Sequence, residues 1–133
     1  MESPEVRRRT MQAVKSKNTA PELLVRSLAH RMGYRFRLHR KDLPGKPDLV
    51  FPGRRKAIFV HGCFWHGHDC ARGARVPKSN RDYWTKKIAR NRERDCAACA
   101  ALALSGWTYL ILWECDLVNE KGLKAQVRKF LNA

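Results

Sequence analysis

Residues 61–70, HGCFWHGHDC, place three histidines, two cysteines and two large aromatic residues in ten consecutive positions. Histidine and cysteine are uncommon, and large aromatic residues normally belong in the core, so structure alone explains this density poorly. Cys63, His68 and Cys70 offer three ligands for a tetrahedral zinc ion, and Cys115, just beyond the apolar run 107–113, is our choice for the fourth. The alternative is a set of buried cysteines with surface histidines. A zinc site of this kind requires the fold to bring Cys115 back to the cluster.

The chain is strongly basic. It has 28 Lys and Arg against 12 Asp and Glu in 133 residues, a formal net charge of +16, with a pI near 10.4. This exceeds what solubility requires and favours a polyanionic partner, nucleic acid first. A membrane surface is disfavoured because no stretch approaches the roughly 20 apolar residues of a span. We expect the run Arg7 to Arg9 and the pair Arg35 and Arg37 to contact phosphates.

The length suits one compact domain, which we place at residues 19–133, after a basic arm at residues 1–18 that orders on a partner. No apolar region follows the basic residues of the N-terminus, so we expect no secretory signal and a cytoplasmic protein. Five cysteines cannot all pair within one chain, which agrees with a reducing compartment and with metal binding. We expect a monomer.

The first half of the chain predicts one helix and three strands. Thr19 and Glu22 match a capping box, and apolar residues at helical spacing follow until Gly33. Residues 34–38 alternate apolar and basic side chains, which predicts a strand with one buried face. Residues 48–51 and 56–60 predict two short antiparallel strands joined at Pro52 and Gly53.

The second half predicts a long helix over 82–104, an apolar strand over 107–113 that is long enough to lie in the middle of a sheet, and a final helix over 122–131. Cys96 and Cys99 fall in the alanine-rich part of the long helix, and we expect both to be buried small residues on one helical face. The order α-β-β-β-α-β-α predicts an α/β fold: a mixed central β-sheet covered by helices on both faces.

A second metal site is indicated where two predicted strands meet. Asp48 opens one strand after a proline, and the next strand ends at Val60 and His61, beside the cluster. A carboxylate and a strand-end carbonyl suit magnesium, which prefers oxygen ligands, water and substrate phosphates. His61 and His66 are then placed to hold a phosphate and to deprotonate an attacking water, because imidazole is the natural base near neutral pH.

With these residues in place, the chain resembles the very short patch repair endonucleases, bacterial enzymes that nick DNA at T:G mismatches. The resemblance spans nearly the whole chain, through KNTAPE at 17–22, PGKPD at 44–48, HGCFWH at 61–66, YW at 83–84, NRERD at 91–95 and WEC at 113–115. It implies the restriction-endonuclease-like fold, whose nucleases usually carry Pro-Asp, a spacer, then Asp or Glu, any residue, and Lys. Here the second half reads Phe59-Val60-His61, a departure that the repair family shares.

The resemblance also implies two metal ions with separate tasks. A catalytic Mg²⁺ falls on Asp48 and the backbone carbonyl of Val60, and Glu22 corresponds to an acidic residue near the metal-bound waters. A structural Zn²⁺ falls on Cys63, His68, Cys70 and Cys115. The capping box is a competing explanation for Glu22.

The family's remaining functional residues are histidines, a carboxylate and aromatic residues. His61 falls on the contact to the scissile phosphate, His66 on the general base, and Asp95 on the carboxylate that orients this base. The aromatic residues that wedge into the duplex beside the mismatch fall on Phe64, Trp65 and Trp84. The competing explanations are a solvated helix face for Asp95 and a core role for Trp84.

The sequence therefore predicts a magnesium-dependent endonuclease that nicks one strand of duplex DNA, 5′ of the thymine in a T:G mismatch. The resemblance implies partnership with mismatch repair proteins of the MutL type and with a DNA cytosine methyltransferase. Two other classes stay open: a restriction-endonuclease-like nuclease without mismatch specificity, and a non-catalytic zinc module that binds DNA.

Overall fold

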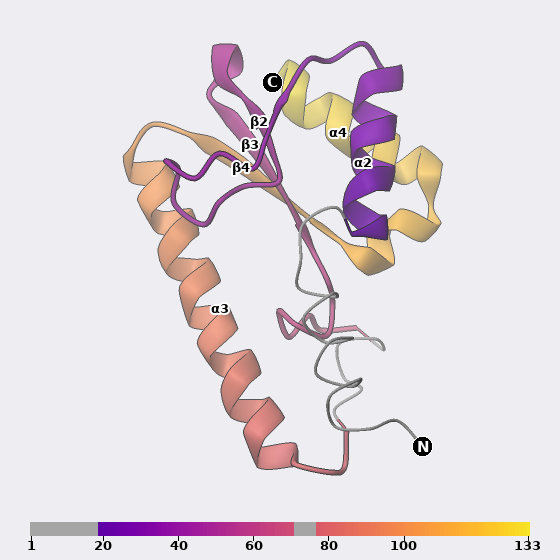
Figure 1. The fold of residues 1–133 in the computed structure, drawn as a ribbon. Coiled ribbons are helices and arrows are strands. Elements are labelled where there is room, and N and C mark those ends of the chain that lie inside the picture. The colour runs from indigo at the N-terminus through magenta and orange to yellow at the C-terminus, as the bar shows by residue number, and fades with distance from the viewer. Residues whose placement is uncertain (1–18, 71–76) are drawn as a thin grey trace.

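The structure is a computed structural model, and it describes residues 19–70 and 77–133 (Figure 1). The predicted N-terminal arm, with Arg7 to Arg9, lies outside the described residues. In the described part of the chain, no helix is both long enough and apolar enough to cross a bilayer.

Four strands form one mixed sheet. In the order in which they pair, they are β1 (Arg37–Leu38), β2 (Leu49–Phe51), β3 (Lys56–His61) and β4 (Thr108–Trp113). The pairs β1–β2 and β2–β3 are antiparallel, which confirms the predicted hairpin, and β3 and β4 are parallel. The parallel register sets His61 opposite Trp113. The ends of β3 and β4 therefore point the segments that follow them toward the same place.

Helices cover both faces of the sheet, as predicted (Figure 1). On one face, α2 (Ala20–Arg31) and α4 (Glu120–Asn132) pack on an apolar cluster that includes Ile58 of β3 and Leu112 of β4. On the other face, the long helix α3 (Arg81–Leu104) packs on a smaller cluster built around Phe59 and Leu102. Successive side chains of a strand point to opposite faces, so β3 contributes Ile58 to one cluster and Phe59 to the other.

The apolar run 107–113 does not take the central position that its length and composition would allow. In the described sheet β4 is an edge strand, paired with β3 on one side. The run is apolar because both of its faces are covered: Ile111 packs against the α3 cluster, while Leu112 is fully buried in the α2–α4 cluster. Burial of both faces produces a continuous apolar sequence whether the strand is central or at an edge.

Two smaller expectations also differ from the structure. The strand predicted over 34–38 reduces to the two residues of β1, although Tyr34 and Phe36 still pack against the larger cluster. Cys99 is buried, as predicted, but Cys96 is exposed. Residues three apart on a helix differ by about 60° around its axis. The face of α3 that packs against the sheet is narrow, so Cys99 lies on it and Cys96 does not.

Candidate active site and metal centres

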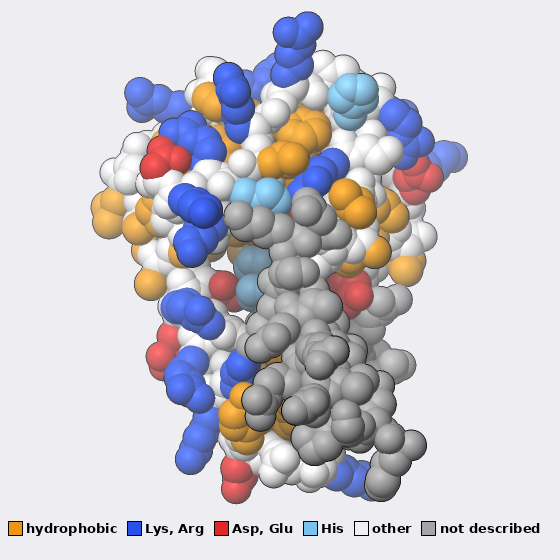
Figure 2. Space-filling view, in the orientation of Figure 1, with side chains coloured by type: hydrophobic (Ala, Val, Ile, Leu, Met, Phe, Trp, Pro, Cys, Tyr) orange, Lys and Arg blue, Asp and Glu red, His pale blue; other side chains and the backbone are white. Residues whose placement is uncertain are grey.

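A cavity of about 1060 Å³ lies beside the end of β3. All five predicted catalytic residues line it: Glu22, Asp48, His61, His66 and Asp95. In this order they come from α2, from the position just before β2, from the end of β3, from the loop after β3 and from α3. Figure 2 shows Lys and Arg side chains along the α3 flank of the molecule and histidine side chains between that flank and the rest of the face. The lining of the cavity combines basic, acidic and imidazole side chains, and its basic residues include Lys41, Lys46 and Arg94.

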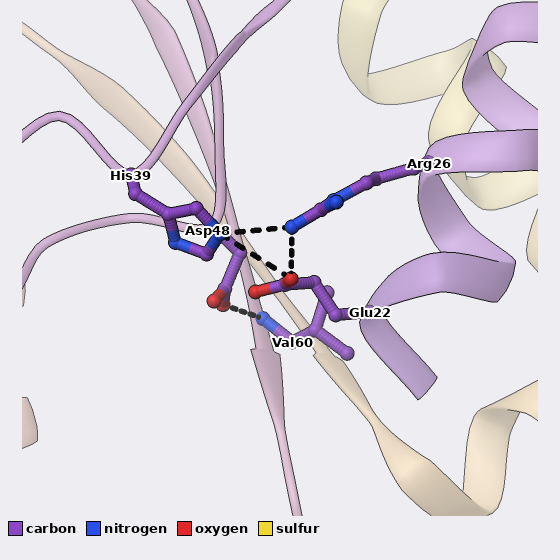
Figure 3. Close-up of polar contacts among 5 residues, drawn as sticks. All are labelled: Glu22, Arg26, His39, Asp48 and Val60. Atoms are coloured by element: carbon purple, nitrogen blue, oxygen red, sulfur yellow. Dashed lines mark hydrogen bonds and ion pairs between the residues drawn. The ribbon is translucent and has the colours of Figure 1, made fainter. Parts of the chain in front are cut away.

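Asp48 and Glu22 form a buried acidic pair. The backbone N–H of Val60 donates to Oδ2 of Asp48 over 2.7 Å (Figure 3). Burial raises the pKa of Asp48 to about 8; a hydrogen bond with Glu22 adds to this rise, and the Val60 N–H opposes it. Glu22 is 3% exposed. Two carboxylates within 4.8 Å of each other repel, and a cation between them removes this repulsion, which is the electrostatic situation of a metal site.

Arg26 and His39 complete this group and were not predicted. Arg26 forms an ion pair with Glu22, and its Nη2 lies 2.8 Å from Nε2 of His39 (Figure 3). Ligand atoms of Glu22, His39 and Asp48 all lie within 4.8 Å of one another. His39 follows β1 in a left-handed conformation, φ 50°, which alternation along a strand does not anticipate. The spacing of Glu22 and Arg26, one helical turn apart, was the available signal.

The predicted capping box at the start of α2 is wrong. Thr19 makes no side-chain capping hydrogen bond, and Glu22 is turned into the cavity. Pro21, in the first turn, lacks an N–H and so leaves one fewer donor to cap. The structural explanation for Glu22 therefore fails, and its contacts are with the acidic site.

His61 and His66 are stacked, with ring centroids 3.7 Å apart. His61 is buried, and its Nδ1 has no hydrogen-bond partner among the described residues. Burial, followed by the nearby His66, lowers the pKa of His61 to about 4, although Asp95 opposes this. Nδ1 of His66 lies 2.5 Å from Oδ2 of Asp95, on α3. A carboxylate at Nδ1 holds the proton there and leaves Nε2 as the basic nitrogen.

The four predicted zinc ligands come together. The donor atoms of Cys63, His68, Cys70 and Cys115 lie within 4.8 Å of one another, and the ring of Trp113 stacks on His68 at 4.1 Å. Because His61 is opposite Trp113, the chain two residues beyond each brings Cys63 and Cys115 together. The backbone N–H of Cys115 donates to Sγ of Cys63 over 3.4 Å.

The donor set fits zinc. Three thiols and one imidazole match a closed tetrahedral shell, in which Zn–S and Zn–N distances of about 2.0–2.3 Å set neighbouring donor atoms about 3.3–3.8 Å apart. Sγ of Cys115 lies 3.4 Å from Nδ1 of His68. Burial raises the pKa of Cys63 to about 12. A metal ion is what would hold this buried sulfur as a thiolate at neutral pH.

The three predicted wedge residues touch each other. Ring centroids of Phe64 and Trp65 are 5.1 Å apart, and Trp84 lies 5.5 Å from Phe64 and 5.7 Å from Trp65. Phe64 and Trp65 are half-buried and line the cavity, whereas Trp84, on α3, is 7% exposed. Trp84 is therefore the support of the aromatic group, and Phe64 and Trp65 form its face toward the cavity.

Comparison with known proteins decides the family. The family described as "DNA mismatch endonuclease Vsr" matches residues 1–72. The chain is 58% identical over 130 residues to "Type II nicking enzyme V.XorIIP" of Xanthomonas oryzae, covering 98% of this chain and 95% of that protein. The chain belongs to the DNA mismatch endonuclease Vsr family.

Other relatives of this Vsr-family protein support the assignment. It is 41% identical over 117 residues to "DNA mismatch endonuclease Vsr" of Escherichia coli K12, covering 88% of this chain and 74% of that one. It is 43% identical over 122 residues to "Type II nicking enzyme V.NmeAIP" of Neisseria meningitidis, with 92% and 84% covered. The predicted family is thereby confirmed, and the chain is a DNA mismatch endonuclease.

Proposed function

We propose that this protein nicks one strand of duplex DNA on the 5′ side of the thymine in a T:G mismatch, by magnesium-dependent hydrolysis of the phosphodiester. One observation carries the proposal: the acidic pair at Asp48 and the ordered base His66–Asp95 face one cavity in a chain of this family. A metal-binding carboxylate and a general base in one cavity are what hydrolysis of a phosphodiester requires.

The acidic pair would hold magnesium, with Asp48 and the backbone carbonyl of Val60 as ligands and Glu22 near the metal-bound waters. The donors are hard oxygens, and the buried pair needs a compensating cation, so the residues fit this ion. When bound, magnesium supplies stabilisation of the charge that develops on the phosphoryl oxygens.

The protein's own groups would divide the remaining work. Nε2 of His66 takes a proton from the attacking water, and Asp95 holds the ring and stabilises the imidazolium that forms. His61, neutral because of its low pKa, donates a hydrogen bond to the scissile phosphate and avoids a second positive charge beside His66.

The second ion would be a structural zinc at Cys63, His68, Cys70 and Cys115. With four protein ligands the shell is closed, so it leaves no position for a reactive water. Three of its ligands lie in residues 63–70, directly after His61, and the same segment carries Phe64, Trp65 and His66. The task of the zinc would be to hold these three side chains in position.

Mismatch selectivity would come from Phe64 and Trp65, supported by Trp84. Aromatic residues that enter a duplex must separate neighbouring base pairs, which costs a few kcal/mol and least at a mismatched step. The basic surface, including the exposed Arg35 and Arg37, would attract any duplex through its phosphates.

The wider setting belongs to the same proposal. We expect a restriction-endonuclease-like fold in a single catalytic domain over 19–133 with a separate N-terminal arm, and a monomer that acts in the cytoplasm. A MutL-type repair protein and a DNA cytosine methyltransferase are the expected partners.

A nicking assay on otherwise identical T:G and T:A duplexes tests the proposal. With magnesium present we expect a single nick 5′ of the mismatched thymine, and loss of nicking with retained DNA binding in Asp48→Asn. Equal nicking of both duplexes would instead identify a nuclease without mismatch specificity. Binding without nicking in the wild type would identify a zinc-containing DNA-binding module.

A further inference from the structure

Asn91 is a polar side chain on the buried face of α3. The other buried residues of this helix are apolar: Trp84, Cys99 and Leu102. Asn91 is 9% exposed. An amide in such a position costs free energy unless both of its ends form hydrogen bonds, so its partners indicate why it is there.

Both ends of the Asn91 amide are bonded, and its orientation is fixed. Nη2 of Arg94 donates to Oδ1 of Asn91. A guanidinium only donates hydrogen bonds, so the oxygen faces Arg94 and the amide nitrogen is left to donate elsewhere. Nδ2 donates to the carbonyl oxygen of Trp65 over 2.8 Å. This carbonyl belongs to the peptide bond between Trp65 and His66, so α3 binds the link between an aromatic residue of the cavity and the proposed base.

The same helix holds the ring of His66. Asp95 lies one helical turn after Asn91, and its Oδ2 is 2.5 Å from Nδ1 of His66. Asn91 therefore fixes the main chain that precedes His66, and Asp95 fixes the imidazole. Because the peptide group between Trp65 and His66 is planar, holding its carbonyl also limits rotation of the backbone on both sides.

The residue after His66 lies directly on α3 as well. Gly67 has a positive φ of 62°, and a Cβ atom at this position would lie 2.6 Å from Cγ2 of Ile88. Glycine alone allows so close an approach. Ile88, Asn91 and Asp95 are three and four residues apart, so they share one face of the helix. This face contacts three successive residues of the loop, 65–67.

We propose that Asn91 is a positioning residue for nicking, which holds the Trp65–His66 peptide on α3 and so aligns the base with the aromatic residues that enter the duplex. The inference rests on the proposed function, because it requires His66 as the base and Trp65 in the DNA. The zinc ligands Cys63 and His68 hold the two ends of this segment, and Asn91 holds its middle. A displacement of about 1 Å in a reacting group can lower a rate by about 100-fold, so this hold matters for turnover.

The variant Asn91→Asp tests the hydrogen bond to Trp65. It keeps the shape of the side chain and an oxygen for Arg94, but it replaces the donor by a second oxygen. We expect the single-turnover nicking rate on T:G duplex to fall by about 10- to 100-fold. Asn91→Leu, which lacks the donor and adds no charge, should show the same loss. Glu93→Gln, at an exposed position of the same helix, is the matched control and should nick at the wild-type rate.

Two measurements with DNA bound separate positioning from binding. The dissociation constant for T:G duplex without magnesium should stay near the wild-type value in Asn91→Asp. The fluorescence of 2-aminopurine beside the mismatch, which rises when a base is unstacked, should also respond as in the wild type. A weaker affinity for T:G than for T:A duplex, relative to the wild type, would assign Asn91 to a base contact and overturn the proposal.

The double mutant shows whether Asn91 acts through His66. Combined with His66→Ala, Asn91→Asp should add little, because the residue that it positions is already absent. Additive losses, or a wild-type rate in folded Asn91→Asp and Asn91→Leu, would overturn the proposal. If thermal unfolding and zinc content show that both are misfolded, Asn91→Ala decides in the same way, since alanine favours the helix. A wild-type rate in His66→Ala would instead overturn the base of the proposed function, so the two failures are distinguishable.

Discussion

The imidazole rings of His61 and His66 lie face to face, 3.7 Å apart at their centroids and 5° from parallel. Two imidazolium ions at this distance would repel each other, so the pair favours at most one positive charge. Burial lowers the pKa of His61 to about 4, whereas His66 has the carboxylate of Asp95 at 2.5 Å. The stack therefore separates two roles: His61 stays neutral, and His66 is the ring that the carboxylate holds.

This arrangement predicts a pH dependence of stability. The unfolded chain protonates His61 near pH 6.5, but the folded chain does so only near pH 4. Between these values the unfolded state binds more protons, so the free energy of unfolding falls as the pH is lowered from 6.5 to 4, by up to about 3 kcal/mol. This fall in stability comes from the imidazole of His61, so His61→Asn should remove it.

Urea unfolding of zinc-replete wild type and His61→Asn across this pH range measures the effect. The difference between the two proteins isolates His61 from other groups that titrate there, including the zinc ligands. Parallel stability curves would show that His61 is protonated in the folded state or that its ring is accessible to water.

Asp48 predicts a change in the free energy of unfolding with pH in the opposite direction. Its folded pKa of about 8 lies above its ordinary value of 3.8. Between these values the folded state binds the extra proton, so the contribution of Asp48 to stability decreases as the pH rises. Without added magnesium, Asp48→Asn should therefore be more stable than the wild type, and the gap should widen by up to about 1.4 kcal/mol per pH unit between pH 4 and 8.

Magnesium supplies the control for this prediction. Because the ion replaces the proton, adding it should stabilise the wild type and leave Asp48→Asn unchanged, which thermal unfolding with and without magnesium can measure. Equal stability of the two proteins at pH 8 without magnesium would contradict the buried acidic pair.

Much of this site could be predicted because its residues follow one another at strand ends. Asp48 precedes β2 and His61 ends β3, and a hairpin brings two such positions together without further information. Cys115 could be chosen because it follows the next apolar strand. The parallel pairing of β3 and β4, which the sequence does not state, is what places it beside Cys63.

The features that were missed depend on contacts between distant segments. His39 reaches Glu22 and Arg26 because it leaves β1 with a positive φ, and the alternating pattern of residues 34–38 gives no sign of this. The edge position of β4 was missed because a strand is apolar when helices cover both of its faces, whether it has one neighbouring strand or two. The capping box failed since the side chain of Glu22 interacts with Arg26 and Asp48 in the cavity.

The zinc site predicts a large loss of stability in Cys115→Ser. The binding free energy of a structural zinc, on the order of 10 kcal/mol, is folding free energy, and loss of one ligand removes part of it. We expect a decrease of about 3 kcal/mol or more in the free energy of unfolding, together with a lower zinc content by metal analysis. Cys96→Ser, at an exposed position outside the cluster, is the matched control and should change neither. A stable, zinc-replete Cys115→Ser protein would exclude Cys115 as the fourth ligand.

The base His66 predicts a separation of binding from turnover. His66→Ala should lower the nicking rate by about 10²- to 10⁴-fold, the usual contribution of a general base, and leave the dissociation constant for T:G duplex nearly unchanged. Single-turnover nicking and DNA binding at the same salt concentration give both quantities. If the mutant nicks at the wild-type rate, another group removes the proton.

Asp95 should act through His66. Asp95→Asn should lower the nicking rate by about 10-fold or more, because the carboxylate that fixes the ring is lost. Combined with His66→Ala it should add little, because its partner is already absent. Glu93→Gln removes an exposed carboxylate from the same helix and should leave the rate unchanged. Additive losses in the double mutant would mean that Asp95 works independently of His66.

The aromatic group of Phe64, Trp65 and Trp84 predicts where mismatch preference resides. A surface with a net charge of +16 attracts T:G and T:A duplexes equally through their phosphates, so it cannot distinguish them. Stacking can, because insertion is least costly at a mismatched step.

Trp65 is the residue to test, because it is half-buried and lines the cavity. A base–aromatic stack is worth about 1–3 kcal/mol, so Trp65→Ala should reduce the ratio of T:G to T:A nicking by about 10-fold. Trp84→Leu keeps an apolar side chain under Phe64 and Trp65 and should lower the ratio less. Arg37→Ala, at an exposed position of β1, should weaken the binding of both duplexes alike.

Nicking rates on both duplexes at one fixed salt concentration measure the T:G to T:A ratio for each variant. An unchanged ratio in Trp65→Ala and Trp84→Leu would assign recognition to hydrogen bonds in the grooves and exclude the wedge.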